Sequence, residues 1–235
     1  SATVLDDWFV NDEMDAGFDF TFKGSCESFV QGKGRTIAFA SYLEKRHKVR
    51  SGYHLAHYLS SHDEPMSLHN LGGDKDLFRL CVAVQMTSFG IPTIYYGEEV
   101  GREGSVWPVN RGDMPWGARK VNPGRGLERD ESLREYYRTL IALRRSNPAL
   151  ASGGYKRLSS DGDLLVFERA LDSGNAVVVA INRGAAPASV EVPAPAAWAG
   201  AAVRDGLAGE PATMQDGALM VNIGPRRARV YVRQD

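Results

Sequence analysis

The residue pattern changes near residue 150, and this change constrains the fold more than any other feature of the chain. Before it, helical patterns alternate with short apolar runs, and after it, short β-type runs are separated by Gly, Pro, Asp and Asn. Alternating strands and helices are typical of a parallel α/β architecture, whereas evenly spaced short strands are typical of an antiparallel sandwich. We therefore expect an α/β domain over residues 1–150 and a small antiparallel β-sandwich domain over residues 151–235.

Three strand-then-helix units are expected in the first domain. Their strands are predicted at Phe18–Phe22, Leu55–Ser60 and Pro92–Tyr96. The first alternates aromatic with polar residues, and the third is short and apolar, as in a parallel sheet that is covered on both faces. A complete (β/α)₈ barrel takes about 250 residues, so three units would form less than half of one.

Capping residues and glycines delimit the helices of this domain. Helical patterns over Ser25–Gln31 and Thr36–Lys48 are separated by glycines. Asp74 is expected to cap the next helix, which is buried because it is apolar on nearly all sides. Ser132 and Glu135 have the spacing of a capping box at the start of the last helix.

The second domain is predicted to contain about six short strands. They are expected at Leu164–Arg169, Ala176–Asn182, Ser189–Val192, Ala201–Arg204, Leu219–Ile223 and Ala228–Val232. The first two flank a hairpin turn at 172–175. Arg226, Arg227 and Arg229 cluster at the start of the last strand, and we interpret them as a charged, solvated sheet edge.

Composition excludes several classes of function. With 28 basic and 29 acidic residues the net charge is −1, so the charge balance does not indicate a nucleic-acid or an anionic-membrane partner. Two cysteines cannot form a disulfide framework, which favours a cytoplasmic location. His54, His57 and His62 could suggest a metal, but the first two face opposite sides of an extended stretch. We therefore expect neither a metal nor a cofactor.

Polar residues follow the second and third predicted strands, where parallel α/β proteins place their active sites. His62 and Asp63 come directly after the second strand, and Glu98 and Glu99 come after the third. A mixed polar and aromatic loop over 110–116 could line a cleft. By itself, the His-Asp pair is more often a turn with a helix cap, and the other two segments could be solvated surface loops.

Five segments taken together indicate one family more specifically than any of them does alone. In chain order they are Asp15–Phe20, Tyr58–Asp63, Gly90–Gly101, Asn110-Arg111 with Met114-Pro115-Trp116, and Tyr137–Leu150. In this order they resemble the sixth to eighth strands and the last helix of the barrel in the α-amylase superfamily of glycoside hydrolases, in its maltodextrin-acting branch. The all-β remainder is similar to the C-terminal domain of that family.

This resemblance implies a catalytic apparatus at the C-terminal face of a (β/α)₈ barrel, with about three βα units in this chain. The family retains anomeric configuration by means of three carboxylates: a nucleophile after the fourth strand, an acid/base after the fifth and a transition-state stabiliser after the seventh. Only the third maps onto this chain, as Asp63. The resemblance implies that His62 and Arg111 bind the sugar of an α-glucan or maltooligosaccharide substrate.

The chain also departs from the family pattern. Ser61 replaces the usual Asn before His-Asp, and Met66 stands where a positively charged residue often follows. The strands that would carry the nucleophile and the acid/base would precede Ser1. We therefore expect the C-terminal part of a longer enzyme, inactive alone and able to self-associate through the open edges of its incomplete barrel.

Two other functions stay open. The chain could be a non-catalytic carbohydrate-binding or assembly module, whose aromatic side chains stack on sugars; the candidates are Tyr95, Tyr96, Trp107 and Trp116. It could also be a self-contained hydrolase, in which Asp63 acts with Glu98, Glu99 or Asp19, because carboxylates at the ends of neighbouring strands can meet.

Overall fold

A computed structural model describes residues 14–46 and 52–234 of the chain. Its first part contains a parallel sheet with the order β1-β2-β3, formed by β1 (Ala16–Asp19), β2 (His54–Tyr58) and β3 (Ile91–Thr93). Helices follow each strand, so the expected alternation of three strands with helices is confirmed, although the second and third strands begin one residue earlier and are shorter than predicted. The helices are α2 (Phe22–Val30), α3 (Thr36–Arg46), α4 (Ser67–Asn70), α5 (Lys75–Thr87), α6 (Glu131–Ser146) and α7 (Pro148–Ser152). Two short 3₁₀ turns, η1 (Glu98–Val100) and η2 (Val109–Arg111), interrupt the long loop after β3.

The first strand ends earlier than its alternating pattern predicts. The carboxylate of Asp19 accepts hydrogen bonds from the backbone N–H of Thr21 at 3.1 Å and from its hydroxyl at 2.9 Å, which turns the chain after β1. Phe22 consequently belongs to α2 and is fully buried, whereas Phe20 is 71% exposed. The predicted strand end at Phe22 is therefore wrong, because a local side-chain turn competes with strand pairing. The predicted helix end at Lys48 lies outside the described residues.

Helix capping agrees with the sequence at one helix and differs at another. Asp74 caps α5 by accepting from the N–H groups of Asp76 and Leu77 at 3.0 and 3.1 Å, as expected. At α6, however, the cap is Asp130, which accepts from the N–H of Leu133 at 2.9 Å. The predicted capping box is thus wrong, since the helix begins one residue before Ser132.

The second part consists of two antiparallel sheets. The larger sheet has the order β4-β5-β6-β11-β8, and the smaller has the order β7-β10-β9. Their strands are β4 (Gly154–Asp161), β5 (Leu164–Ala170), β6 (Ala176–Asn182), β7 (Ala188–Pro193), β8 (Val203–Asp205), β9 (Thr213–Gln215), β10 (Ala218–Ile223) and β11 (Arg227–Arg233). In the described chain no helix is long and apolar enough to cross a bilayer.

β8 pairs with β11 only over Tyr231–Arg233, so at the basic cluster β11 pairs with β6 alone, in agreement with a charged, solvated edge. Arg226 and Arg227 also form ion pairs with Asp74 and Asp76 at the start of α5, at 2.8 and 3.1 Å. These contacts join the last strand of the chain to a helix of the first part.

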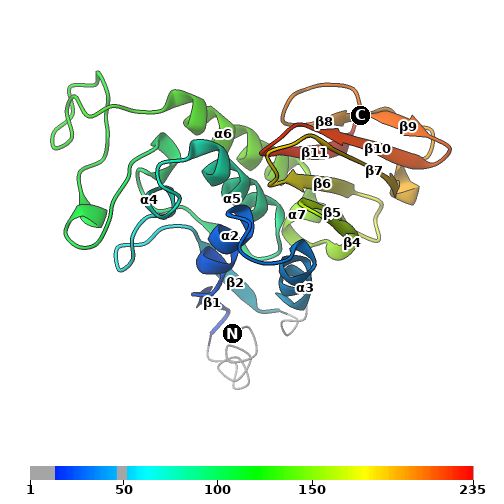
Figure 1. Cartoon of the computed structure of the whole chain (residues 1–235), viewed down its shortest axis with the longest axis horizontal. Coiled ribbons are helices and arrows are strands. Elements are labelled where there is room, and N and C mark those ends of the chain that lie inside the picture. Colours follow the sequence, from blue (N-terminus) through cyan, green and yellow to red (C-terminus); the bar gives the residue numbers. More distant parts are fainter. Residues whose placement is uncertain (1–13, 47–51, 235) are drawn as a thin grey trace.

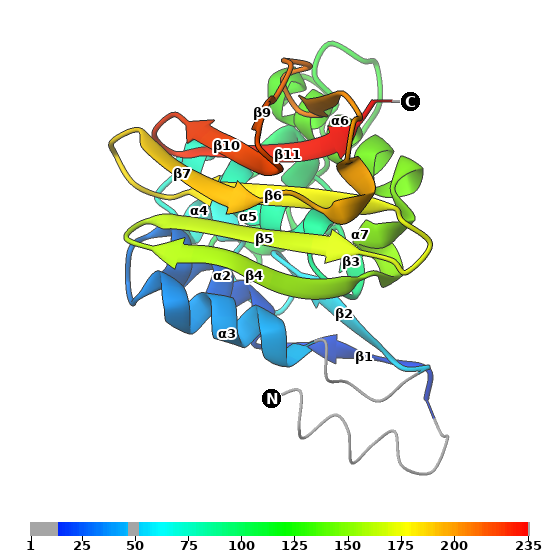
Figure 2. The same cartoon turned by 90° about the vertical axis from the view of Figure 1, so that its right-hand side faces the viewer.

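Alternation along β5 and β6 divides the apolar residues between two cores. One set packs against the helices: Leu165, Phe167, Val177, Val179 and Ile181. Their neighbours face the smaller sheet: Leu164, Val166, Ala176, Val178 and Ala180. Successive strand residues point to opposite faces, so both faces of these two strands are buried. Figure 2 shows the larger sheet lying across the helices.

The first core is continuous across residue 150, since it contains α2, α5 and α6 residues as well as β5 and β6 residues. The guanidinium of Arg169 adds polar contacts to this boundary: it donates to four backbone carbonyls, including that of Thr87 in α5 at 2.8 Å. The antiparallel sheets lie at one end of the molecule, and the long loop after β3 lies at the other (Figure 1). The division of the chain into domains at residues 1–150 and 151–235 stays a prediction.

Candidate functional site

The segments that follow β2 and β3 form the candidate site. After β2 ends at Tyr58, the chain passes through the buried Leu59 and Ser60 before it reaches the surface. The hydroxyl of Ser60 accepts a hydrogen bond from the N–H of Ser67, at 3.3 Å, so the first turn of α4 holds the strand end. Residues 61–64 therefore form a short loop between two anchored points, with His62 and Asp63 exposed at its tip.

The three residues that the sequence assigned to this site lie together. The imidazole Nε2 of His62 is 3.2 Å from Oδ1 of Asp63, and Nη2 of Arg111 is 3.4 Å from the same oxygen. Arg111 also donates from Nε to the backbone carbonyl of His62, at 3.1 Å. The Asp63 side chain stays 70% exposed, so its second carboxylate oxygen is accessible to a ligand. Convergence of the three side chains is a property of the structure, while their roles stay predictions.

Asn110 connects the two segments, a role for which the sequence holds no clue beyond the polar loop. Its side chain is almost fully buried, and Nδ2 donates to the carbonyls of His62 and Glu64, at 2.9 and 3.2 Å. Asn110 is thereby joined to backbone carbonyls 48 and 46 residues earlier in the chain. The loop after β3 thus determines where the backbone of His62 and Asp63 lies.

A buried arginine organises the loop after β3. The guanidinium of Arg102 donates to the carbonyls of Tyr96 and Asn110, at 3.3 and 3.1 Å, and lies 4.5 Å from the ring centroid of Tyr96. Gly97 has φ +87°, and a Cβ there would lie 2.7 Å from Nε of Arg102. A residue other than glycine would therefore push this guanidinium away from the loop that it holds.

The carboxyl of Glu98 is buried behind this loop. The Tyr137 hydroxyl of α6 donates to its Oε1, at 3.3 Å. Burial raises the pKa of Glu98 to about 8, and hydrogen bonds from Ser60 and Tyr137 oppose that rise only in part. At neutral pH this group is mostly protonated and enclosed, which suits a structural contact between β2, α6 and the loop.

Asp19 and Glu99 are equally poor partners for Asp63. The carboxylate of Asp19, at the end of β1, is 2% exposed and forms a buried ion pair with Arg46 of α3. Glu99 is half-buried, and its Oε2 is shielded from solvent. The carboxylates of a self-contained hydrolase would have to face a common ligand, and the described contacts direct Asp19 and Glu98 into the protein instead.

Apolar side chains cover one exposed face near the strand ends. The rings of Phe18, Phe20 and Tyr58 are 6.0–6.4 Å apart between centroids. Phe18 is 53% exposed, and Ile91 on β3 is 45% exposed. In the described residues no three His, Cys, Asp or Glu side chains gather to hold a metal ion.

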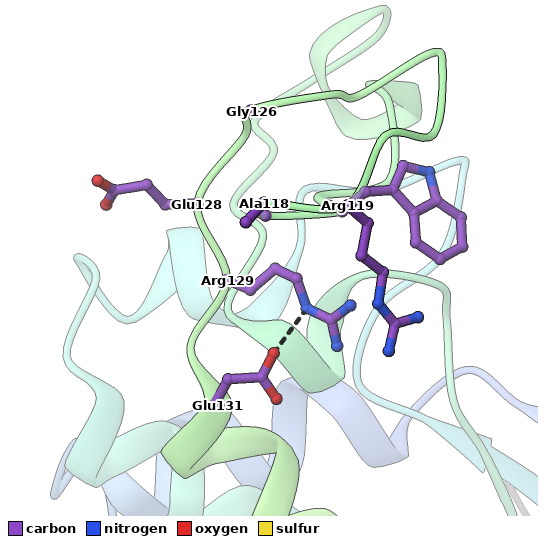
Figure 3. A pocket seen from close by; sticks show the side chains of 8 residues that line it. Ala118, Arg119, Gly126, Glu128, Arg129 and Glu131 are labelled. Carbon is purple, nitrogen blue, oxygen red and sulfur yellow. Dashed lines mark ion pairs between the residues drawn. The ribbon is translucent and has the colours of Figure 1, made fainter.

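A pocket of about 710 Å³ opens in the loop that leads to α6 (Figure 3). It is lined by Trp116, Gly117, Ala118, Arg119, Gly126, Glu128, Arg129 and Glu131. His62, Asp63 and Arg111 do not line it, so it is separate from the convergent residues after β2. It belongs to the segment that begins with the Met114-Pro115-Trp116 motif.

Comparison with known proteins gives consistent relatives. The profile of the family described as alpha amylase, catalytic domain, matches residues 2–135. Neopullulanase 2 of Thermoactinomyces vulgaris is 31% identical over 183 residues, which cover 75% of this chain and 30% of the relative. A cyclomaltodextrinase of a Bacillus species is 31% identical over 158 residues, which cover 66% of this chain and 27% of the relative.

Solved structures match over nearly the whole chain. The Thermus thermophilus protein Ttha1563 has a TM-score of 0.83 and 27% identity, covering 97% of this chain and 50% of that protein. An α-amylase of H. orenii has a TM-score of 0.81 at 21% identity, covering 100% of this chain and 52% of its own, and this second likeness concerns the fold alone. The chain therefore spans about half of these structures and less than a third of the two curated relatives named above.

Proposed function

The chain belongs to the α-amylase catalytic-domain family, and we propose that it is the C-terminal part of a retaining, α-glucan-acting glycoside hydrolase. Its three parallel strands would be the sixth to eighth strands of a (β/α)₈ barrel, followed by a C-terminal β-sandwich domain that begins near residue 151. The reaction would be hydrolysis or transglycosylation of maltodextrins, and relatives named neopullulanase and cyclomaltodextrinase support this class of substrate.

The convergence of His62, Asp63 and Arg111 carries the proposal. In this assignment the exposed oxygens of Asp63 accept hydrogen bonds from sugar hydroxyls, and they stabilise the positive charge that develops on the sugar in the transition state. His62 donates to a neighbouring hydroxyl. Arg111 contacts both residues, at 3.4 Å from the Asp63 carboxylate and 3.1 Å from the His62 carbonyl, and so fixes their positions relative to each other.

The chain supplies one of the three carboxylates that the mechanism needs. A retaining enzyme places its nucleophile and its acid/base about 5 Å apart, on either side of the scissile bond. Asp19 and Glu98 are buried against Arg46 and Tyr137, so neither suits that task. We therefore assign the nucleophile and the acid/base to residues outside this chain, and we expect the chain alone to be inactive.

The test is release of reducing sugar from maltoheptaose by the purified chain, beside an Asp63→Asn variant. No release above that of the variant is expected, because removal of the nucleophile and the acid costs orders of magnitude in rate. Calorimetric titration with maltoheptaose should nevertheless detect binding that Asp63→Asn and Arg111→Ala weaken. Hydrolysis that Asp63→Asn abolishes would place the nucleophile within the chain and refute the proposal.

A carbohydrate-binding module is the second candidate, since Trp107 is 69% exposed and Tyr96 is 41% exposed beside the loop after β3. In a module of this kind, Trp107→Ala would abolish binding of maltoheptaose, while Asp63→Asn would leave the affinity unchanged. For part of a hydrolase site, Asp63→Asn should weaken the binding of maltoheptaose and Trp107→Ala should leave it unchanged.

The open edges of the parallel sheet also predict self-association. β1 and β3 have unpaired sides within the described residues, and Phe18, Phe20 and Ile91 are exposed beside them. Such edges and apolar faces pair with other chains. Sedimentation velocity should therefore show concentration-dependent association, and a monodisperse monomer at high concentration would contradict this expectation.

A further inference from the structure

We propose that the pocket between residues 116 and 131 is an accessory binding site for a segment of α-glucan, distinct from the site at His62, Asp63 and Arg111. The choice of an α-glucan rests on the proposed function. The existence of a sugar site at this place rests on the pocket itself, whose volume of about 710 Å³ is within the range of ligand sites.

Backbone hydrogen bonds close the loop that forms the pocket. The N–H of Gly117 donates to the carbonyl of Leu127, at 2.8 Å, and the N–H of Gly126 donates to the carbonyl of Gly117, at 3.1 Å. Gly124 has φ +89°, and a Cβ there would collide with the carbonyl oxygen of Met114. The two limbs of the loop therefore lie against each other, and the walls of the pocket are held by the backbone as well as by side chains.

Two guanidinium groups reach into the pocket, and only that of Arg129 has a partner among the residues that the structure describes. The side chain of Arg129 is 7% exposed, and its Nε lies 3.0 Å from Oε1 of Glu131. Arg119 is exposed, and its side chain makes no hydrogen bond or ion pair with the rest of the described chain. Figure 3 shows the guanidinium of Arg119 on the same side as that of Arg129, whereas the carboxylate of Glu128 points away. Arg119 is thus available to a ligand.

The mixture of groups fits a neutral polyol better than an anion. The indole of Trp116 offers an apolar ring on which the face of a sugar can stack. Sugar hydroxyls both donate and accept, so they can donate to Glu131 while they accept from Arg119 and Arg129. An anion could use the arginines, but the Glu131 carboxylate would repel it. A glucan held here would also raise the local concentration of substrate for a site on the same polypeptide.

The experiment is calorimetric titration of the whole 235-residue chain with maltoheptaose, repeated with inorganic phosphate. The pocket variants are Trp116→Ala and Arg119→Ala. Lys120→Ala is the matched control, because Lys120 is an exposed neighbouring cation that does not line the pocket. His62→Ala reports on the other site. The Arg119 side chain is exposed and unpartnered in the described chain, so its replacement should leave the circular dichroism spectrum unchanged.

We expect Arg119→Ala to weaken one class of maltoheptaose binding about fivefold and Trp116→Ala to weaken it by about tenfold or more. Lys120→Ala should change nothing, and His62→Ala should leave this class intact. Unchanged affinity in both pocket variants, or no detectable binding by the unmodified chain, would overturn the accessory site. Binding of phosphate alone, dependent on Arg119, would also overturn it, because the pocket would then be an anion site.

The outcomes separate this inference from the proposed function. If only His62→Ala and Asp63→Asn weaken binding, the accessory site fails and the proposed function stands. If only Trp116→Ala and Arg119→Ala weaken it, the accessory site stands, and the sugar site proposed at Asp63 fails.

Discussion

Replacing Glu98 with glutamine should remove a large part of the pH dependence of folding. The carboxyl of Glu98 is 1% exposed, and the hydroxyl of Tyr137 lies 3.3 Å from its Oε1. Burial raises its pKa from 4.5 to about 8, so the folded protein keeps a proton that the unfolded chain releases at lower pH. Between these two values the folded state binds more protons, and the free energy of unfolding therefore falls as the pH rises.

The size of the effect follows from the two pKa values. Where protonation of the two states differs fully, the free energy of unfolding falls by about 1.4 kcal/mol per pH unit. The slope flattens near 4.5 and near 8, so the loss between pH 5 and pH 8 is about 3 to 4 kcal/mol. Glutamine has nearly the same shape and stays neutral. The variant should therefore be the more stable protein at pH 8.

The assay is urea-induced unfolding, followed by circular dichroism at pH values from 5 to 8. Subtracting the variant from the unmodified protein at each pH cancels the contributions of other titrating groups. Glu135→Gln is the control, because that side chain is 67% exposed and its surface ion pair with Arg138 contributes little. Parallel pH profiles for Glu98→Gln and the unmodified chain would refute the buried, protonated carboxyl on which the argument depends.

Three further substitutions test other contacts. Gly90→Ala should lower the free energy of unfolding in urea by about 2–4 kcal/mol, because Gly90 has φ +111° and a Cβ would lie 2.9 Å from Nδ1 of His57. As its control, Gly72→Ala, at φ +69° with open space around it, should lower that free energy by only about 1 kcal/mol. Burial lowers the pKa of His57 from 6.5 to about 3, so protonation of the unfolded chain should cost about 2 kcal/mol of stability at pH 5. His57→Phe, which can keep the stacking on Phe22, should lose that acid sensitivity, and an unchanged acid limb would contradict the assignment. Arg169→Met should lower the free energy of unfolding by about 3 kcal/mol and Tm by about 10 °C, because four carbonyls lose their donor; an unchanged Tm would mean that relief from guanidinium burial offsets those bonds.

Local patterns account for the part of the fold that could be predicted. Ala176–Asn182 is predicted as a strand with the bounds that β6 has, because an unbroken apolar run between turn residues has few other stable conformations. The cap at Asp74 is equally local, since its carboxylate binds N–H groups two and three residues later. The pattern does not predict β4, because that strand is largely exposed and polar, or β9, because it has only three residues.

For the candidate site, the sequence predicts the residues of the motifs but not the contacts that hold them in place. His62, Asp63 and Arg111 lie in segments that follow strands, where parallel sheets place their functional groups. Asn110 is visible in the sequence only as a polar loop residue, because its role depends on carbonyls of residues 46 and 48 positions earlier in the chain. No local pattern of residues carries information about such partners.

The order and type of most elements, the cap at Asp74 and the motif that places the chain in its family all follow from local patterns in the amino-acid sequence. Which charges are buried, and what they contact, depends instead on how distant segments pack. Glu98 and Glu99 are adjacent carboxylates in the sequence, yet Glu98 is enclosed against Tyr137, a residue 39 positions away. Burial and long-range hydrogen bonds control protonation, and both arise only when distant segments pack together.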